Sequence, residues 1–212
     1  IKGAVLGSPI SHSLSPQIHN AAYNILQINA EYSRYDVKSG ELAKFLLSHP
    51  EMNALSLTMP LKEEALLVAD FVSPISNQIQ SGNTLSKEDG KWRLTSTDVE
   101  GFTEAFVANG VKLDGSVLIL GSGATARAVA AAIDSDRSIN ERQIHIVHRN
   151  PDRESAMRQA APSSELVFHG WSSNNLLNEV SLVINTSPAG AADVFCADLS
   201  KPAGVYFEAL YN

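Results

Sequence analysis

The sequence contains a single cysteine, Cys196, among its 212 residues. One cysteine cannot form a disulfide within the chain, so a disulfide framework is excluded and a reducing compartment such as the cytoplasm is expected. Basic residues are also few, with 16 lysines and arginines against 23 aspartates and glutamates and a net charge of -7. Because no basic stripe is present, we expect no nucleic-acid-binding surface.

Long hydrophobic runs are absent as well. The longest weakly charged apolar stretch, "VLILGSGATARAVAAAI" at 117–133, contains Arg127 and a glycine turn. We therefore expect no membrane span and no signal peptide, and we assign no metal ligands. The chain opens on Ile1 and closes on the strand-like "GVYFEALYN", so we expect further C-terminal structure to be missing.

Strand-like and helix-like segments alternate along the chain, with 44% hydrophobic residues to supply a core. Asp89-Gly90, between two short strand-like runs, predicts a β-hairpin. A helix at 99–110 precedes a second alternating series. This pattern predicts an α/β fold in which an N-terminal α/β domain, 1–100, is followed by a Rossmann-type domain, 101–212. In the first domain, strands are expected at 2–7, 30–37 and 53–59, and helices at 16–27, 39–49 and 60–72.

Three serines stand before the first expected helix, in "SHSLSPQIHNAAY" at 11–23. Ser15 is suited to the N-cap and Pro16 to the first helical position. One serine is enough to cap a helix, so Ser11 and Ser13 call for another explanation.

A glycine turn lies between an expected strand and an expected helix. Gly121, Gly123 and Ala126 give the pattern G-x-G-x-x-A, in which small residues permit a tight turn and close approach to a pyrophosphate. The N-terminus of the helix offers N–H groups to phosphate. The alternative is a plain turn between strand and helix. The turn residues that we assign to dinucleotide binding are Gly121, Ser122, Gly123, Ala124 and Thr125.

The next expected strand ends in "HRN", where an NAD enzyme usually carries a carboxylate for the ribose hydroxyl. This chain has His148 and Arg149 there, followed by Arg153. Because an arginine can pair with a 2′-phosphate, the pattern favours NADP, and we assign all three residues to cofactor binding. The alternative is that the arginines are solvated residues at a helix start, paired with its acidic side chains.

Lys62 follows Pro60 at an expected strand-to-helix turn. A lysine at a helix N-terminus is disfavoured by the helix dipole, so an anionic partner or a reactive role would explain it. An exposed lysine remains the plainer alternative. Asp98 could be only a helix N-cap and Asn83 only a turn residue, and their spacing alone does not unite them with Lys62.

These segments occur in an order that resembles the shikimate dehydrogenase family. The resemblance rests on "SHSLSP", "LTMPLKE", "GNTL", "TDVEGF", "GSGATARA", "HRNPDR" and "NTSPAG", which span nearly the whole chain. It implies a first domain that binds shikimate, a second that binds NADP, and an active site in the cleft between them.

The resemblance also implies roles for individual residues. Ser13 and Ser15 would bind the substrate carboxylate, whereas Ser11 falls outside the motif. Thr58 and Asn83 would bind the ring hydroxyls, and Lys62 with Asp98 would form the catalytic pair. The loop "NTSPAG" would lie beside the nicotinamide, and we assign its Thr186 and Ser187 to cofactor binding. Without the resemblance, that loop reads equally well as a simple polar connection.

The chain departs from the family pattern at several positions. Ser56 and Leu57 stand where the family often has Asn-Val, and Met59 and Leu61 replace common Ile and His. His148 stands where Asn often precedes the arginine, which weakens the preference for NADP slightly. The family continues into a region with a substrate-binding glutamine and a glycine near the nicotinamide, and neither is in this sequence.

The resemblance implies NADP-dependent reversible reduction of 3-dehydroshikimate to shikimate, in the biosynthesis of chorismate and aromatic amino acids. The partner is then a small molecule, and the oligomeric state stays open, with a homodimer as one option. The alternatives are a quinate/shikimate dehydrogenase of broader specificity, another Rossmann-type oxidoreductase, and a non-catalytic NADP(H)-binding module.

Overall fold

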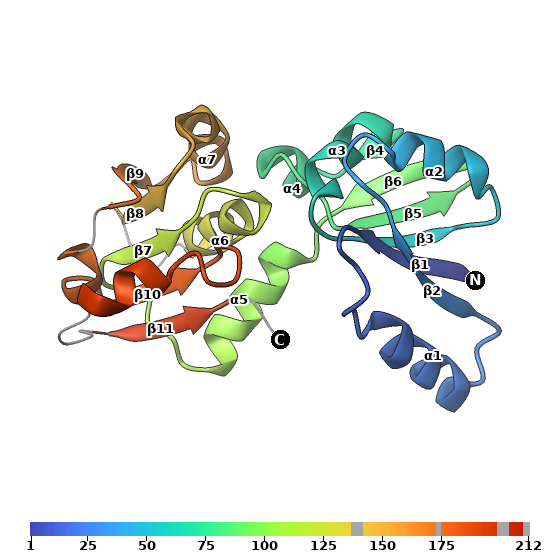
Figure 1. The fold of residues 1–212 in the computed structure, drawn as a ribbon, viewed down its shortest axis with the longest axis horizontal. Coiled ribbons are helices and arrows are strands. Elements are labelled where there is room, and N and C mark those ends of the chain that lie inside the picture. Colours follow the sequence, from blue (N-terminus) through green and yellow to red (C-terminus); the bar gives the residue numbers. More distant parts are fainter. Residues whose placement is uncertain (137–141, 173–174, 199–203, 210–212) are drawn as a thin grey trace. The chain divides into compact units, whose positions relative to one another are not determined.

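The computed structural model describes residues 1–136, 142–172, 175–198 and 204–209, and the chain divides into two units, Ile1–Thr97 and Asp98–Asn212. Each unit has its own β-sheet with helices packed against it (Figure 1). The predicted α/β fold class is confirmed.

The first unit is built on a mixed sheet in the order β2-β1-β3-β5-β6-β4. β1 pairs in parallel with β2 and β3, whereas β5 runs antiparallel to β3 and β6. Leucines from the sheet and from two helices form its core. The elements are β1 (Lys2–Gly7), α1 (Ser15–Leu26), β2 (Glu31–Asp36), α2 (Leu42–Ser48), β3 (Ala54–Leu57), α3 (Leu61–Val68), β4 (Phe71–Val72), α4 (Pro74–Gln78), β5 (Thr84–Glu88) and β6 (Lys91–Thr95).

The hairpin predicted from Asp89-Gly90 is confirmed. Both residues have positive φ, 52° for Asp89 and 78° for Gly90, as a two-residue turn of the I′ type requires. Thr84 therefore pairs with Thr95 at the opposite end of the hairpin. That end matters for function, because the predicted site residue Asn83 precedes β5 there.

The single helix expected over 60–72 is wrong in its second half. α3 ends at Val68, and Phe71 and Val72 form the short edge strand β4. The cause is pairing with β6: the Asp70 N–H donates to the Trp92 carbonyl at 2.9 Å, and the Trp92 N–H donates to the Asp70 carboxylate at 2.8 Å. These contacts lie far apart in sequence, so local periodicity did not show them.

The second unit holds a parallel sheet whose described strands have the order β11-β10-β7-β8-β9. β7 pairs with β8 on one side and with β10 on the other, so the strand order reverses at β7. In open α/β sheets, ligands bind outside the carboxyl ends of the strands at such a point. The elements are α5 (Asp98–Ala108), β7 (Val117–Leu120), α6 (Ala124–Ser135), β8 (Gln143–His148), η1 (Pro151–Arg153), α7 (Glu154–Ala160), β9 (Glu165–Gly170), η2 (Asn175–Asn178), β10 (Leu182–Asn185), η3 (Asp193–Asp198) and β11 (Val205–Glu208).

Helix α6 is the most buried helix of this unit, with every residue from Ala126 to Asp134 buried. Its many alanines let the helix approach its neighbours closely. α5 contributes Phe102 and Phe106, whose rings lie 6.1 and 5.5 Å from the ring of Phe207 on β11. None of the helices in the described ranges combines the length and apolar character needed to span a bilayer.

Candidate active site

The residues predicted to bind substrate gather at one edge of the first unit's sheet. β1, β3 and β6 end at this edge, and β5 begins there because it is antiparallel to its neighbours. The flanking loops carry these residues from three separate parts of the first unit: Ser13 and Ser15 follow β1, Thr58 and Lys62 follow β3, and Asn83 precedes β5. Asp98 is the first residue of the second unit and directly follows Thr97 in the chain.

The two serines assigned to carboxylate binding contact each other. The Ser13 hydroxyl donates to Ser15 Oγ at 3.2 Å and accepts the Ser15 N–H at 3.3 Å. The expected N-cap is wrong by one position, because α1 begins at Ser15 itself and Leu14 stands at the cap. Arg34 fixes the loop by donating to the carbonyls of Ser11 and Ser13, at 2.7 and 3.2 Å. Ser11 thus contributes a backbone oxygen to the loop.

The turn between β3 and α3 positions Thr58 and Lys62. The Thr58 N–H donates to the Leu6 carbonyl at 2.9 Å, and the Thr58 carbonyl accepts the Leu61 N–H at 2.8 Å. β1 packs closely here, since a Cβ on Gly7 would lie 2.9 Å from the Met59 carbonyl oxygen. Lys62 lies in the first turn of α3, at the strand-to-helix turn that the sequence predicted, and its side chain is half-buried.

Asn83 links three parts of this edge. Its carbonyl accepts the Leu57 N–H at 2.7 Å, which joins it to the end of β3. Its side-chain oxygen accepts the Thr97 N–H at 3.1 Å, and its amide donates to Thr97 Oγ1 at 2.9 Å. The preceding Gly82 N–H donates to the Lys62 carbonyl at 2.9 Å. Thr97, which sequence reasoning missed, therefore connects Asn83 to Asp98, the next residue and the first of α5.

Ser56, one of the departures from the family pattern, has a partner inside the first unit. Its Oγ accepts the hydroxyl of Tyr32 at 2.6 Å. Burial raises the pKa of Tyr32, so this phenol stays protonated and acts as a donor. Ser56 thus links β3 to β2 across β1, one residue before β3 ends.

In the second unit, the glycine turn lies at the point where the strand order reverses. Gly121 has a φ of +115°, which disfavours any side chain, and a Cβ there would lie 2.7 Å from Thr186 Oγ1. Thr186 itself is held by its hydroxyl, which donates to the Leu120 carbonyl at 2.8 Å. The turn after β7 and the loop after β10 therefore touch, and α6 begins just beyond with Gly123 at its N-cap. This backbone fits a dinucleotide pyrophosphate, because a turn without side chains leads directly into helix N–H groups.

The loop after β10 is organised by Asn185. Its side-chain oxygen accepts the N–H and hydroxyl of Ser187 at 3.0 and 2.6 Å, and its amide donates to Glu208 at 2.9 Å. Ser187 is buried and commits its hydroxyl proton to this contact. Ser187 could then contribute to cofactor binding only as a hydrogen-bond acceptor or by shaping the loop.

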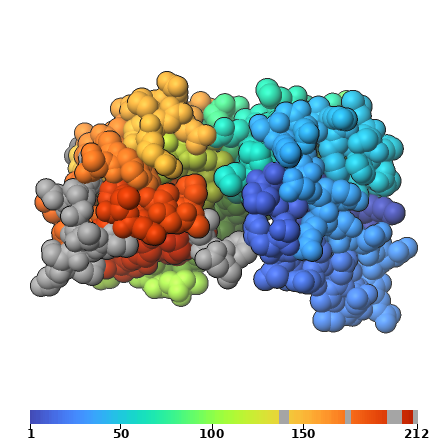
Figure 2. Space-filling model, viewed as in Figure 1, coloured from blue at the N-terminus to red at the C-terminus, as the bar shows by residue number. Residues whose placement is uncertain are grey.

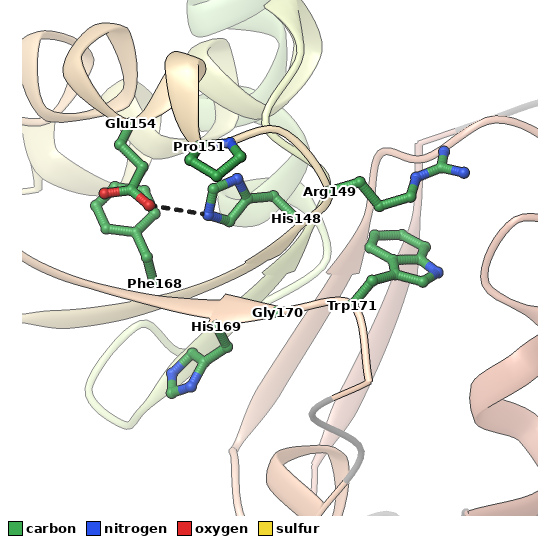
Figure 3. A pocket seen from close by; sticks show the side chains of 8 residues that line it. All are labelled: His148, Arg149, Pro151, Glu154, Phe168, His169, Gly170 and Trp171. Atoms are coloured by element: carbon green, nitrogen blue, oxygen red, sulfur yellow. Dashed lines mark ion pairs between the residues drawn. The ribbon is translucent and has the colours of Figure 1, made fainter.

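A pocket of about 440 Å³ lies at the carboxyl ends of β8 and β9 (Figure 3). The guanidinium of Arg149 lies over the ring of Trp171, 5.0 Å from its centroid. Residues 149–153, which follow β8, are all exposed. This part of the second unit (yellow to orange) lies on the face shown in Figure 2. The pocket is lined by His148, Arg149, Pro151, Glu154, Phe168, His169, Gly170 and Trp171.

The strand end carries a histidine–carboxylate pair that the sequence pattern did not predict. Glu154, from the start of α7, places Oε1 3.3 Å from Nε2 of His148, so its carboxylate pairs with this histidine (Figure 3). His148 Nδ1 lies 2.9 Å from the Asn150 carbonyl. Arg153 approaches the glycine turn, with Nη1 3.5 Å from where a Cβ of Gly123 would stand. The two predicted arginines thus lie at the pocket and at the glycine turn, respectively.

The fold and these sites define a class of protein. The second unit has a parallel sheet with a glycine turn at the point where its strand order reverses. The first unit carries a lysine and several hydroxyl side chains near one edge of its sheet. Together these features are typical of a Rossmann-type oxidoreductase. Within the described ranges, no three His, Cys, Asp or Glu side chains form a group that could hold a metal ion.

Comparisons with known proteins narrow the class to a family. A family model for the shikimate dehydrogenase substrate binding domain matches residues 5–85. The shikimate dehydrogenase (NADP(+)) of Hyphomonas neptunium is 32% identical over 214 residues, covering 98% of this chain and 77% of that protein. The chain belongs to the shikimate dehydrogenase family.

Solved structures agree with this assignment. Shikimate 5-dehydrogenase from Thermus thermophilus, in complex with NADP(H) and shikimate, has a TM-score of 0.81 at 30% identity, over 98% of this chain and 78% of that one. Shikimate dehydrogenase of Mycobacterium tuberculosis has a TM-score of 0.82 at 31% identity, over 100% of this chain and 79% of that one.

Proposed function

We propose that this protein catalyses the NADP-dependent, reversible reduction of 3-dehydroshikimate to shikimate, in the biosynthesis of chorismate and aromatic amino acids. The observation that carries the proposal is the edge of the first unit's sheet where β1 and β3 end and β5 begins, because Ser13 and Ser15, Thr58 and Lys62, and Asn83 lie in the segments that flank these strand ends. Hydroxyl, amide and ammonium groups of this kind suit a small acid with several hydroxyl groups. We also propose a cytoplasmic location, which the single cysteine supports.

In this proposal the substrate carboxylate binds at the start of α1. Ser13 and Ser15 would present their hydroxyls there, beside the free N–H groups of the first helical turn. The contact between the two serines sets their spacing before substrate arrives. Thr58 and Asn83 would bind ring hydroxyls, and Asn83 is already fixed by Thr97.

Lys62 and Asp98 would handle the proton. Reduction of a ketone leaves a negative charge on its oxygen, and that oxygen must then gain a proton. Lys62 would stabilise the charge and donate the proton, and in the reverse direction it would accept it. Asp98 would orient the Lys62 ammonium and bind a substrate hydroxyl. When bound, the reduced nicotinamide cofactor supplies the hydride.

The second unit would hold the cofactor. The turn from Gly121 to Thr125 would bind the pyrophosphate, and Thr186 with Ser187 would shape the loop on the nicotinamide side. Arg149 and Arg153 would pair with the 2′-phosphate, which is the group that distinguishes NADP from NAD. His148 would act beside them, at the end of β8.

The test is an activity assay that follows reduced-nicotinamide absorbance. The protein is given shikimate or quinate, each with NADP or NAD. Rapid turnover only with shikimate and NADP is the expected result. Comparable turnover with quinate would assign the chain to the quinate/shikimate dehydrogenases. Absence of turnover with every pair, in protein that is folded and binds NADP, would leave a binding module in place of an enzyme.

A further inference from the structure

Glu154 has no part in the roles assigned so far, yet it pairs with His148. His148 is the last residue of β8, and its side chain is only 5% exposed. Nδ1 faces the Asn150 carbonyl at 2.9 Å, and Nε2 faces Glu154 Oε1 at 3.3 Å. Both partners are acceptors, so each contact is a hydrogen bond when the ring nitrogen that faces it carries a proton. The ring therefore links the strand end to the first residue of α7.

Glu154 stands in a pocket where a free carboxylate would oppose the proposed ligand. It lines the same pocket as Arg149, which is the arginine that we propose for the 2′-phosphate. A carboxylate disfavours a phosphate nearby and favours a ribose hydroxyl, to which it can act as an acceptor. His148 holds this carboxylate against its ring (Figure 3).

We propose that His148 is a positioning residue for cofactor selection: by holding the Glu154 carboxylate against its ring, it keeps the end of β8 selective for a 2′-phosphate over a 2′-hydroxyl. This inference rests on the proposed NADP-dependent function. It assigns to His148 and Glu154 a role that neither arginine fills, because the pair controls a negative charge inside the pocket. Release of Glu154 would weaken NADP binding and leave NAD binding unchanged or stronger.

The test measures dissociation constants of NADP and NAD by titration calorimetry. In His148→Asn, the amide can still donate to the Asn150 carbonyl but is too short to reach Glu154. We expect NADP to bind about tenfold more weakly, as for a like-charge penalty close to a phosphate, with NAD binding within about twofold of wild type. In His148→Gln, the amide can still donate toward Glu154, and we expect a smaller loss.

The matched variants remove the carboxylate. Glu154 is the half-buried partner of His148, and the Glu154→Gln variant should bind NADP at least as tightly as wild type does. The double variant His148→Asn with Glu154→Gln should recover NADP affinity to within about threefold of wild type, because no charge is left to repel the phosphate. Thermal melting of each variant checks that the second unit is folded. Glu154→Gln alone keeps the test decisive if the histidine variants do not fold.

Three results would overturn the inference. The first is an equal loss of NADP and NAD affinity in His148→Asn, which would mean a structural role. The second is a double variant as weak as His148→Asn. The third is a tenfold loss of NADP affinity in Glu154→Gln. Wild-type protein that is folded but binds no NADP would instead overturn the proposed function, and this inference with it.

Discussion

At the scale of single residues, Lys62 is notable because its position in a helix is unfavourable for a cation. It lies in the first turn of α3, where the positive end of the helix dipole disfavours a cation. The same turn contains Glu63 and Glu64, which is the usual composition for this position. Glu64 is engaged elsewhere, since it accepts the N–H groups of Gly40 and Leu42 at 2.7 and 2.9 Å. The proposed role in substrate chemistry would account for a lysine at this position.

Lys62→Ala is expected to lower kcat about 100-fold or more with little change in the KM for shikimate, because general acid–base catalysis contributes at least that much. Steady-state kinetics in both directions would measure it. Lys44→Ala, which removes an exposed lysine from α2, should leave kcat unchanged. A kcat within a few-fold of wild type in Lys62→Ala would end the catalytic assignment.

Arg149 offers a second residue-scale prediction. It is an exposed residue whose guanidinium lies over Trp171, and we propose that this guanidinium pairs with the 2′-phosphate. Arg149→Ala should raise the KM for NADP about tenfold and leave NAD use nearly unchanged. Arg93→Ala, which removes the same charge from an exposed position on β6 of the first unit, serves as the control and should alter neither. If NADP and NAD suffer equally in Arg149→Ala, the arginine is holding Trp171 in place and not reading the phosphate.

At the scale of elements, the strand–turn–helix unit of β7 and α6 depends on Gly121. Its φ of +115° and the 2.7 Å approach to Thr186 Oγ1 exclude a side chain for two separate reasons. Gly121→Ala is expected to lower the free energy of unfolding by about 1–2 kcal/mol, as forcing an L-residue into such backbone does, and to weaken NADP binding. Urea unfolding and calorimetry would measure the two effects.

Gly101→Ala is the control for that change. Gly101 is an exposed residue inside α5, and an added Cβ would meet nothing within 4 Å. Alanine should therefore raise stability, by about 0.5–1 kcal/mol from helix propensity. If Gly121→Ala were as stable as Gly101→Ala and still bound NADP normally, the turn would not be the pyrophosphate site.

Elements with local causes were the ones that the sequence predicted well. The glycine turn and the Asp89-Gly90 hairpin are fixed by the backbone freedom of residues within the turns themselves. β4 was missed because Asp70 pairs with Trp92, which is far away in sequence. α2 begins at Leu42, three residues later than expected. The N–H of Leu42 donates to the side chain of Glu64 on α3, which is also distant in sequence. Tertiary contacts of this kind leave no periodic pattern in the segment that they reshape.

The same distinction holds for the sites. The order of the motifs was enough to assign Ser13, Thr58 and Asn83 to one site. It did not predict the hydrogen bonds between Asn83 and Thr97, because these depend on the pairing of β5 with β6. Glu154 is only six positions from His148, but its pairing with the ring could not be told from pairing with a neighbouring arginine. Side-chain direction at the end of a strand decided between the two.

At the scale of the whole molecule, the two units need not share one stability. Each has its own sheet, and each carries one of the two tryptophans, Trp92 in the first and Trp171 in the second. Single-tryptophan variants therefore let fluorescence follow each unit separately. Trp92→Phe leaves Trp171 as the reporter of the second unit, and Trp171→Phe leaves Trp92 as the reporter of the first.

The second unit contains a pair of histidines that makes its stability depend on pH. His145 on β8 and His169 on β9 approach with Nδ1 and Nε2 2.9 Å apart. Burial lowers the pKa of both rings, and the charge of His169 lowers the pKa of His145 further, against smaller opposing effects of Glu165 and Glu179. Both groups thus stay neutral in the folded unit at pH values where the unfolded chain already binds protons.

The stability of the second unit should therefore fall as the pH drops below about 6.5, the ordinary histidine value, and the loss is complete once the folded pKa values are passed. In Trp92→Phe protein, the urea midpoint reported by Trp171 should decrease between about pH 7 and 5.5. Adding His145→Gln and His169→Gln should remove most of that decrease, because no ring is left to take up protons on unfolding. The midpoint reported by Trp92 in the Trp171→Phe protein should not respond to the histidine changes. A decrease that persists in full without both histidines would place the acid sensitivity of this unit elsewhere.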